Sequence, residues 1–292
     1  MATSHETQRR RQHRLYPLVG LVALVVALLV LFAWLRGVLL GQVSTPMLPD
    51  EQCVVRVGSQ ADSLDLEQSG NAAIIVAESI RRGLPARASS IALATAMQES
   101  NLRNIDYGDR DSLGLFQQRP SQGWGTEAQI MDPWYSSGKF YEHLVKVAGW
   151  QGGDINDVAQ AVQRSGVPDG YRKHVEKAKV WGSALTGHSP AAVSCIDRGS
   201  VTPNTSYATD LLTKAFGSSV KSSVAQARVT LNSADETQLW AATQLFMMTT
   251  RTSGVTSVDV GQRSWTMKPD AVADWTGTAT PKPTEAAITL RS

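Results

Sequence analysis

An uncharged apolar run near the N-terminus constrains this chain more than any other feature. The segment from Leu15 to Leu35, LYPLVGLVALVVALLVLFAWL, contains no charged side chain. A helix of about 20 apolar residues is what the hydrocarbon core of a membrane requires. The segment therefore predicts one transmembrane helix over residues 15–36. The alternative is a cleaved signal peptide, but the apolar region is longer than usual for one and no A-x-A-like cleavage site precedes the polar sequence.

The charges on either side of this run predict its orientation. Residues 1–14 contain four arginines and one acidic residue, and basic flanks stay on the cytoplasmic side of a membrane. We therefore expect a cytoplasmic basic leader, residues 1–14, and a single-pass protein of the cell membrane whose main domains are extracytoplasmic. The chain has 28 basic and 26 acidic residues. The leader contains four of the basic residues and one of the acidic residues, so the rest of the chain has 24 basic and 25 acidic residues. This balance excludes the basic footprint of a nucleic-acid-binding protein.

The chain has two cysteines, Cys53 and Cys195, and both fall on the exported side, where a disulfide can persist. They are candidates for a disulfide, although two unrelated buried thiols fit the sequence as well. There is no C-x-x-C, and the five histidines are scattered without ligand spacing. We expect no metal and no cofactor.

Sequence texture divides the exported part of the chain into five regions. Apolar residues at helical spacing predict a mainly α domain, which includes a helix from about Ala86 to Ser100. Beyond it a helix–strand pattern predicts a small α/β (α+β) C-terminal domain. The full division is a stalk at 37–70, the mainly α domain at 71–195, a linker at 196–206, the small domain at 207–276 and a Thr/Pro-rich disordered tail at 277–292.

One carboxyl group lies where its chemistry should be unusual. Glu99 ends the apolar helix ARASSIALATAMQES and shares a face with small and apolar residues. Burial disfavours the charged carboxylate, and so does the negative end of the helix dipole. We therefore expect a raised pKa and a protonated acid near neutral pH. Cleavage of a glycosidic bond needs such a group, because the leaving oxygen must receive a proton.

The neighbourhood of Glu99 resembles the soluble lytic transglycosylase domains of the lysozyme-like superfamily. The helix ends in MQES (97–100) and is followed by SLGLFQ (112–117). In that family a Glu-Ser pair ends a buried helix, and a Gly-Leu-Met-Gln-like turn follows whose Gln faces the sugar cleft. Phe116 replaces the usual Met. A later Ala-Tyr-Asn-Ala-Gly run is matched loosely by AVQRSG (161–166), followed by Tyr171.

This resemblance covers roughly residues 71–185 and implies that the mainly α domain is lysozyme-like. It implies that Glu99 acts as the general acid and then as the base. The positions that it implies for substrate binding or support of the turn are Ser100, Ser112, Gly114, Gln117, Gln163 and Tyr171. The implied partners are peptidoglycan glycan strands, and the implied activity is cleavage of the MurNAc–GlcNAc bond by a lytic transglycosylase or a lysozyme-type hydrolase.

The route of cleavage depends on a second carboxylate, because hydrolases of both stereochemical classes generally use a pair. Asp106, Asp109 and Asp111 are available in the loop after Glu99, although turn and capping roles explain them equally. If none lies opposite Glu99, the substrate's own hydroxyl would attack and give an anhydro-muropeptide. Four aromatic side chains that follow the loop could stack on sugars or pack in the core: Trp124, Trp134, Tyr135 and Tyr141.

Two other functions fit the same sequence. The lysozyme-like cleft could bind cell-wall glycan without turnover and serve as a scaffold for a wall-associated machine. Alternatively, the C-terminal domain could dock a protein partner, with the helical domain as its support. Loss of the Glu99 carboxyl would abolish only the enzymatic role.

Overall fold

The structure is a computed structural model that describes residues 21, 24–36, 48–199, 202–279 and 281–291. Contacts divide the chain into two units, residues 1–48 and residues 49–292, and the second is the compact unit described below. Among the residues that the structure describes, no helix has the combination of length and apolar character needed to cross a membrane. The predicted transmembrane helix at 15–36 includes residues 15–20 and 22–23, which lie outside that description.

The compact unit begins with a small antiparallel sheet. Strands β1 (Gln52–Val57) and β2 (Gln60–Asp65) form a hairpin, and β3 (Val193–Ile196) pairs with the other edge of β1. Cys53 and Val55 are buried on one face of β1, whereas Arg56 is exposed, as the two-residue period of a strand requires. The sheet brings the first and last parts of the helical region together.

Cys53 and Cys195 face each other across β1 and β3 and form a disulfide. Both cysteines are buried. The bond closes a loop with a sequence separation of 142 residues, and this loop contains most of the helical region.

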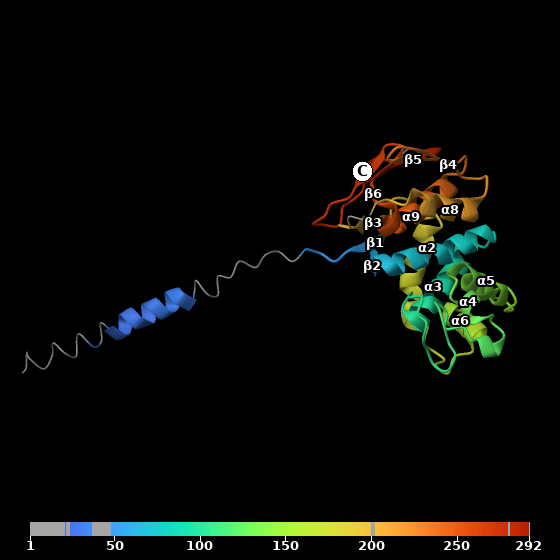
Figure 1. The fold of residues 1–292 in the computed structure, drawn as a ribbon, viewed down its shortest axis with the longest axis horizontal. Helices are drawn as coiled ribbons and strands as arrows, with labels where there is room; N and C mark the ends of the chain where they lie inside the picture. The colour runs from blue at the N-terminus through green and yellow to red at the C-terminus, as the bar shows by residue number, and fades with distance from the viewer. Residues whose placement is uncertain (1–20, 22–23, 37–47, 200–201, 280, 292) are drawn as a thin grey trace, which may run out of the picture. The chain divides into compact units, whose positions relative to one another are not determined.

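Helices make up about half of the region between the two cysteines (Figure 1). Helix α3 lies among the others and contacts α2, α5, α6 and α7. Every side chain from Ala88 to Met97 is buried, so apolar and small residues surround the whole helix. The bounds are α2 (Leu66–Arg81), α3 (Ala86–Ser100), α5 (Pro133–Leu144), α6 (Ile155–Gln163) and α7 (Val175–Leu185), with the short elements η1 (Pro120–Gln122), α4 (Glu127–Ile130) and η2 (Arg172–His174).

Small residues let the neighbouring helices approach α3 closely. A Cβ atom at Gly182 of α7 would lie 2.5 Å from the hydroxyl oxygen of Ser90, so a larger residue there would force Ser90 to move. On the α2 side, the hydroxyl oxygens of Ser79 and Ser89 lie 2.6 Å apart in a buried hydrogen bond. These contacts fix α3 against both neighbours.

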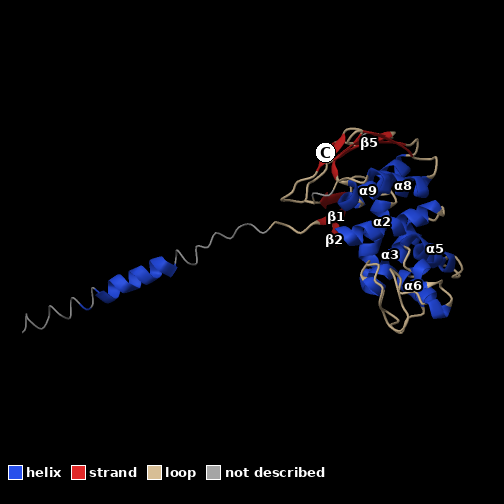
Figure 2. Ribbon diagram, viewed as in Figure 1, coloured by secondary structure: helices blue, strands red, loops and turns tan. Residues whose placement is uncertain are grey.

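The rest of the compact unit is a six-stranded antiparallel sheet with helices on one side. In Figure 2 the sheet, its helices and α2 form successive layers, in agreement with the contacts of α9 to β5 and of α2 to α8 and α9. The sheet order is β4-β5-β9-β6-β7-β8. The bounds are α8 (Thr205–Phe216), β4 (Lys221–Ala225), β5 (Arg228–Asn232), α9 (Glu236–Met248), α10 (Thr250–Ser253), β6 (Val255–Val260), β7 (Arg263–Thr266), β8 (Thr276–Gly277) and β9 (Glu285–Leu290).

A buried glutamine joins this layer to the helical region. The Gln244 side chain on α9 accepts hydrogen bonds from the backbone N–H groups of Ala192 and Val193 and donates to the carbonyl oxygens of Ala184 and Ser189. Because buried polar groups are costly to leave unpaired, this set of bonds specifies how the two regions pack.

The expected fold class, a mainly α lysozyme-like domain after one transmembrane helix and before a small α/β domain, is wrong. The described chain is a mixed α/β fold with two sheets. The predicted stalk at 37–70 contains β1, β2 and the start of α2, because the alternation in CVVRV is too short to stand out among polar residues. The predicted disordered tail at 277–292 contains β9, which pairs with both β5 and β6. Its apolar residues 286–288 and 290 follow a Thr/Pro-rich segment that dominates the local composition.

We predict that the disulfide stabilises the compact unit substantially. Replacing Cys53 and Cys195 together by alanine removes a cross-link that closes a long loop in the unfolded chain. Removal of a native disulfide typically lowers the free energy of unfolding by roughly 2–5 kcal/mol, and a long loop favours the upper end of that range. Urea denaturation of the full-length chain measures this loss. If the double variant had the same midpoint and slope as the parent, the cross-link would contribute nothing to stability.

Candidate functional site

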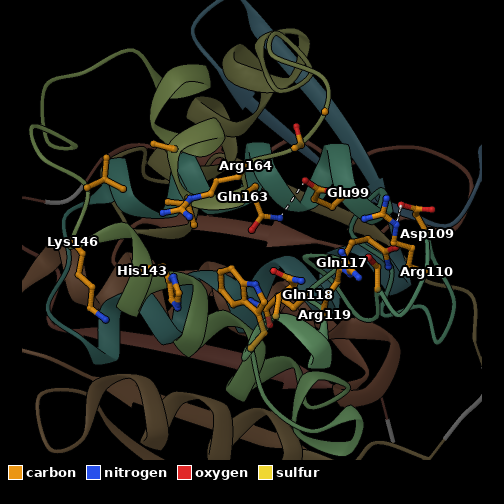
Figure 3. Close-up of a pocket in the computed structure, with 18 residues that line it drawn as sticks. Glu99, Asp109, Arg110, Gln117, Gln118, Arg119, His143, Lys146, Gln163 and Arg164 are labelled. Atoms are coloured by element: carbon orange, nitrogen blue, oxygen red, sulfur yellow. Dashed lines mark hydrogen bonds and ion pairs between the residues drawn. The ribbon is translucent and has the colours of Figure 1, made fainter.

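The candidate site is a cavity of about 710 Å³ at the C-terminal end of α3. Its walls come from the loop between α3 and α4, the last turn of α5 and the end of α6. Figure 3 shows the side chains that line the cavity, with Gln163 lying between Glu99 on one side and Lys146 and His143 on the other.

Glu99 is half-buried in the wall of this cavity. The Tyr171 hydroxyl donates to its Oε1 at 2.6 Å, and the Gln163 amide donates to the same oxygen at 3.2 Å. Among the described residues, no hydrogen bond reaches Oε2. One carboxyl oxygen is therefore held by the protein, and the other is left for a proton or a ligand.

Burial raises the pKa of Glu99 above the ordinary glutamate range. The hydrogen bonds from Tyr171 and Gln163 stabilise the carboxylate and offset part of that rise. The pKa of Tyr171 is also raised, first by burial and then by the neighbouring charge of Glu99. Tyr171 is therefore a protonated donor throughout the neutral range.

The loop after α3 is tied to the helix next to Glu99. The Ser100 hydroxyl donates to the carbonyl oxygen of Leu115 at 2.8 Å, in addition to a bond within its own helix. Leu113 and Gln118 exchange two backbone hydrogen bonds of 3.0 Å, which close the turn. Gly114 has φ +73°, and a side chain there would lie 2.8 Å from the carbonyl oxygen of Ile130. Ser100 therefore ties the turn to the end of α3, and Gly114 allows the turn to approach the backbone of Ile130 closely.

Gln117 lines the cavity in a left-handed backbone conformation, with φ 48°. Its amide nitrogen donates to the carbonyl oxygens of Tyr107 and Gly114 at 3.2 and 3.3 Å. Gly108 makes room for this amide, because any side chain there would overlap it. A non-glycine residue in this conformation costs energy, and such strain is common at functional sites. Ser112 is buried and also lines the cavity.

Gln163 and Tyr171 lie in different environments. Gln163 lines the cavity and donates to both Glu99 and the carbonyl oxygen of Phe116, the latter at 2.7 Å. Tyr171 is fully buried and is not part of the lining. Its position supports a role in holding the Glu99 carboxyl rather than the substrate contact suggested by the sequence.

The three aspartates of the loop do not supply a buried partner for Glu99. Asp111 pairs with Arg119 at 2.7 Å and accepts from the backbone N–H of Ser121 at 2.8 Å. The bonds from Ser121 and then Arg119 lower its pKa, so Asp111 is a structural carboxylate. Asp109 lines the cavity but is exposed, and Asp106 is not part of the lining.

The four candidate sugar-stacking aromatics separate into three environments. Trp124 lines the cavity and stacks on His143, with the ring centroids 4.2 Å apart. Tyr141 is buried and donates to the carbonyl oxygen of Ile75. Trp134 and Tyr135 line a different hollow, where Lys214 lies over the Trp134 ring. Of the four, Trp124 alone is in place to contact a ligand beside Glu99.

The basic residues of the cavity were not predicted from the sequence. Arg110, Arg119, Lys146 and Arg164 line it, against the acidic side chains of Glu99 and Asp109. Arg110 and Arg119 lie in the loop that follows α3, where attention to charge would have found them. Lys146 and Arg164 follow the ends of α5 and α6, and their joint position depends on how those helices pack.

Comparison with protein-family models and with curated proteins finds no match to this sequence. In the described part of the chain, no group of three or more His, Cys, Asp or Glu side chains is arranged to hold a metal ion. The function is therefore inferred from the geometry of the cavity.

We predict that the Glu99 carboxyl destabilises the fold at neutral pH. Because its folded pKa is raised, the carboxyl is protonated in both states at low pH, and folding loses stability as the pH rises from the unfolded pKa through the folded pKa. Glu99→Gln stays neutral, so its melting temperature should exceed that of the parent at pH 7 and match it near pH 3. Calorimetry at several pH values tests this. An equal difference at every pH would contradict a shifted pKa.

Proposed function

We propose that this protein cleaves the MurNAc–GlcNAc glycosidic bonds of peptidoglycan, with Glu99 as its single catalytic carboxyl. The observation that carries the proposal is the arrangement of that carboxyl, half-buried at the cavity with both of its protein hydrogen bonds on Oε1. A raised pKa keeps a proton available, and Oε2 is the oxygen from which it can be given.

In the first step, the proton on Oε2 of Glu99 passes to the glycosidic oxygen as the bond from that oxygen to the sugar carbon breaks. Tyr171 and Gln163 stabilise the carboxylate that forms, since they already donate to Oε1. Their positions are set by the packing of the fold, so little reorganisation accompanies the charge change.

In the second step, the substrate itself supplies the nucleophile. Asp109, the other acidic residue in the cavity lining, is exposed, whereas an inverting or retaining hydrolase needs a positioned second carboxylate. The Glu99 carboxylate therefore removes a proton from a hydroxyl of the same sugar, whose oxygen bonds to the sugar carbon and gives an anhydro product. This route makes the protein a lytic transglycosylase, and a lysozyme-type hydrolase is the alternative.

The second candidate function is a glycan-binding module without turnover. The loose match of residues 161–166 to the family's third motif favours it, because Val162 and Gln163 stand where that motif has a Tyr-Asn pair. The proposal also includes attachment to the cell membrane through residues 15–36, extracytoplasmic placement of the compact unit and a protein partner for the C-terminal region.

We predict that full-length protein releases anhydro-muropeptides from purified peptidoglycan and that Glu99→Gln lowers this rate by about 10²–10⁴-fold, the usual contribution of a general acid. Mass analysis of the products measures both. Glu176→Gln is the matched control, because Glu176 is an exposed residue outside the cavity that pairs with Lys179. The full chain is needed because truncation before residue 285 would remove β9 from the sheet.

Three other outcomes would change the proposal. Products with reducing ends would indicate hydrolysis. Sedimentation with peptidoglycan without release would favour the binding module. Equal release by Glu99→Gln and the parent would exclude Glu99 as the acid.

We predict that Tyr171→Phe shifts the pH dependence of cleavage. Loss of the hydroxyl removes a stabiliser of the Glu99 carboxylate, so the pKa of Glu99 rises further. Because the acid acts in its protonated form, the fall of activity at high pH should move to higher pH. A pH profile of initial rates measures this shift. An unchanged alkaline limb would show that Tyr171 does not hold the catalytic carboxyl.

A further inference from the structure

The end of the cavity away from Glu99 is rich in positive charge. His143 lies in the last turn of α5, Lys146 follows that helix, and Arg164 caps the C-terminal end of α6. All three line the cavity, and Figure 3 shows Lys146 and His143 far to one side of Glu99, with Arg164 extending toward them.

These side chains act on one another electrostatically. Burial is the first cause of the lowered pKa of His143. The positive charges of Lys146, Lys139 and Arg164 lower this pKa further, and the negative charge of Glu142 offsets part of their effect. His143 is therefore a neutral ring at pH 7, stacked on Trp124 at the same end of the cavity.

Lys146 and Arg164 have no ion-pair partner among the described residues. By contrast, Arg119 in the same lining is paired with Asp111. Cations at the C-terminal end of a helix interact favourably with the helix dipole, and this explains part of their placement. It does not explain why two of them border one cavity and form no ion pair with any described acidic residue.

We propose that Lys146 and Arg164 form an anion subsite that binds a carboxylate carried by the glycan substrate. The ligand is a chain of N-acetylated sugars with an acidic side group. This group is the lactyl carboxylate of a MurNAc residue or, where a peptide is attached to that residue, a carboxylate of the peptide. The inference rests on the proposed function, since it takes the cavity to be a glycan site. It adds that the site selects acidic glycan over neutral glycan of the same backbone.

The position of the subsite fits such a ligand. Trp124 presents an aromatic ring at this end of the cavity, and an aromatic face packs well against the CH groups of a sugar ring. Trp124 stacks on His143, so a sugar that contacts the exposed part of its ring would lie at the end of the cavity lined by Lys146 and Arg164, with Glu99 toward the other end. A carboxylate on this sugar would then lie near Lys146 and Arg164, and the glycosidic bond would point toward Glu99.

The test compares two tetrasaccharides with the same β-1,4-linked backbone. One is built of GlcNAc alone and is neutral, and the other has alternating MurNAc residues with free lactyl carboxylates. Binding is measured by calorimetry on the full-length Glu99→Gln protein, which prevents turnover. We expect the acidic tetrasaccharide to bind about 3- to 10-fold more tightly, since each exposed charge pair contributes modestly.

The variant Lys146→Gln/Arg164→Gln should lose this preference and bind both tetrasaccharides equally. Glutamine at position 164 adds no backbone strain, because Arg164 is already a non-glycine residue in the left-handed conformation, with φ 55°. The matched control is Lys221→Gln/Lys268→Gln, which removes two exposed charges outside the cavity and should keep the preference.

Two results would overturn the subsite alone. One is equal binding of both tetrasaccharides by the Glu99→Gln protein, and the other is a preference that survives when Lys146→Gln/Arg164→Gln is added to it. Each would leave the glycan site in place. A failure of either tetrasaccharide to bind at all would instead count against the proposed glycan site, and the subsite would fail with it.

Discussion

The close packing of α3 is the constraint on which the site depends. The helix is buried along nearly its whole length, and glycine or serine at its contacts with α2 and α7 leaves no room for rotation. Its last turn is consequently fixed relative to the loop that Ser100 ties down. A carboxyl at position 99 must therefore lie at the boundary between the core and the cavity, where it is partly removed from water and still accessible to a ligand.

Two opposing electrostatic effects then determine the state of that carboxyl. Burial favours the neutral acid, whereas Tyr171 and Gln163 favour the carboxylate. Both donors act on Oε1, so they stabilise the charge without occupying the oxygen that would give up a proton. A group that must be an acid in one step and a base in the next needs such a balance, since a strong preference for either form would slow the other step.

The sequence predicted helix 86–100 and placed Glu99 at its end, because a long apolar segment has a clear helical pattern. It also identified Gln117 and Gln163, which the structure brings into the same cavity as Glu99. Strands β1, β3 and β9 were missed because each is four to six residues long and lies beside a polar or Thr/Pro-rich stretch. Tyr171 was assigned to the substrate through the loose match to the family's third motif. Its contact with Glu99 spans 72 positions in the chain, and no local pattern reports such a pairing.

The central claim is that the Glu99 carboxyl is protonated at a pH where an ordinary glutamate, with a pKa of about 4.3, is ionised. Infrared difference spectroscopy of the parent minus Glu99→Gln, recorded as a function of pH, observes this group directly through the C=O stretch of a protonated carboxyl. A band that persists well above the ordinary glutamate range, and disappears at higher pH, is the predicted result. A band that is lost within the ordinary range would show that Glu99 is a solvated carboxylate and would remove the basis for acid catalysis at this site.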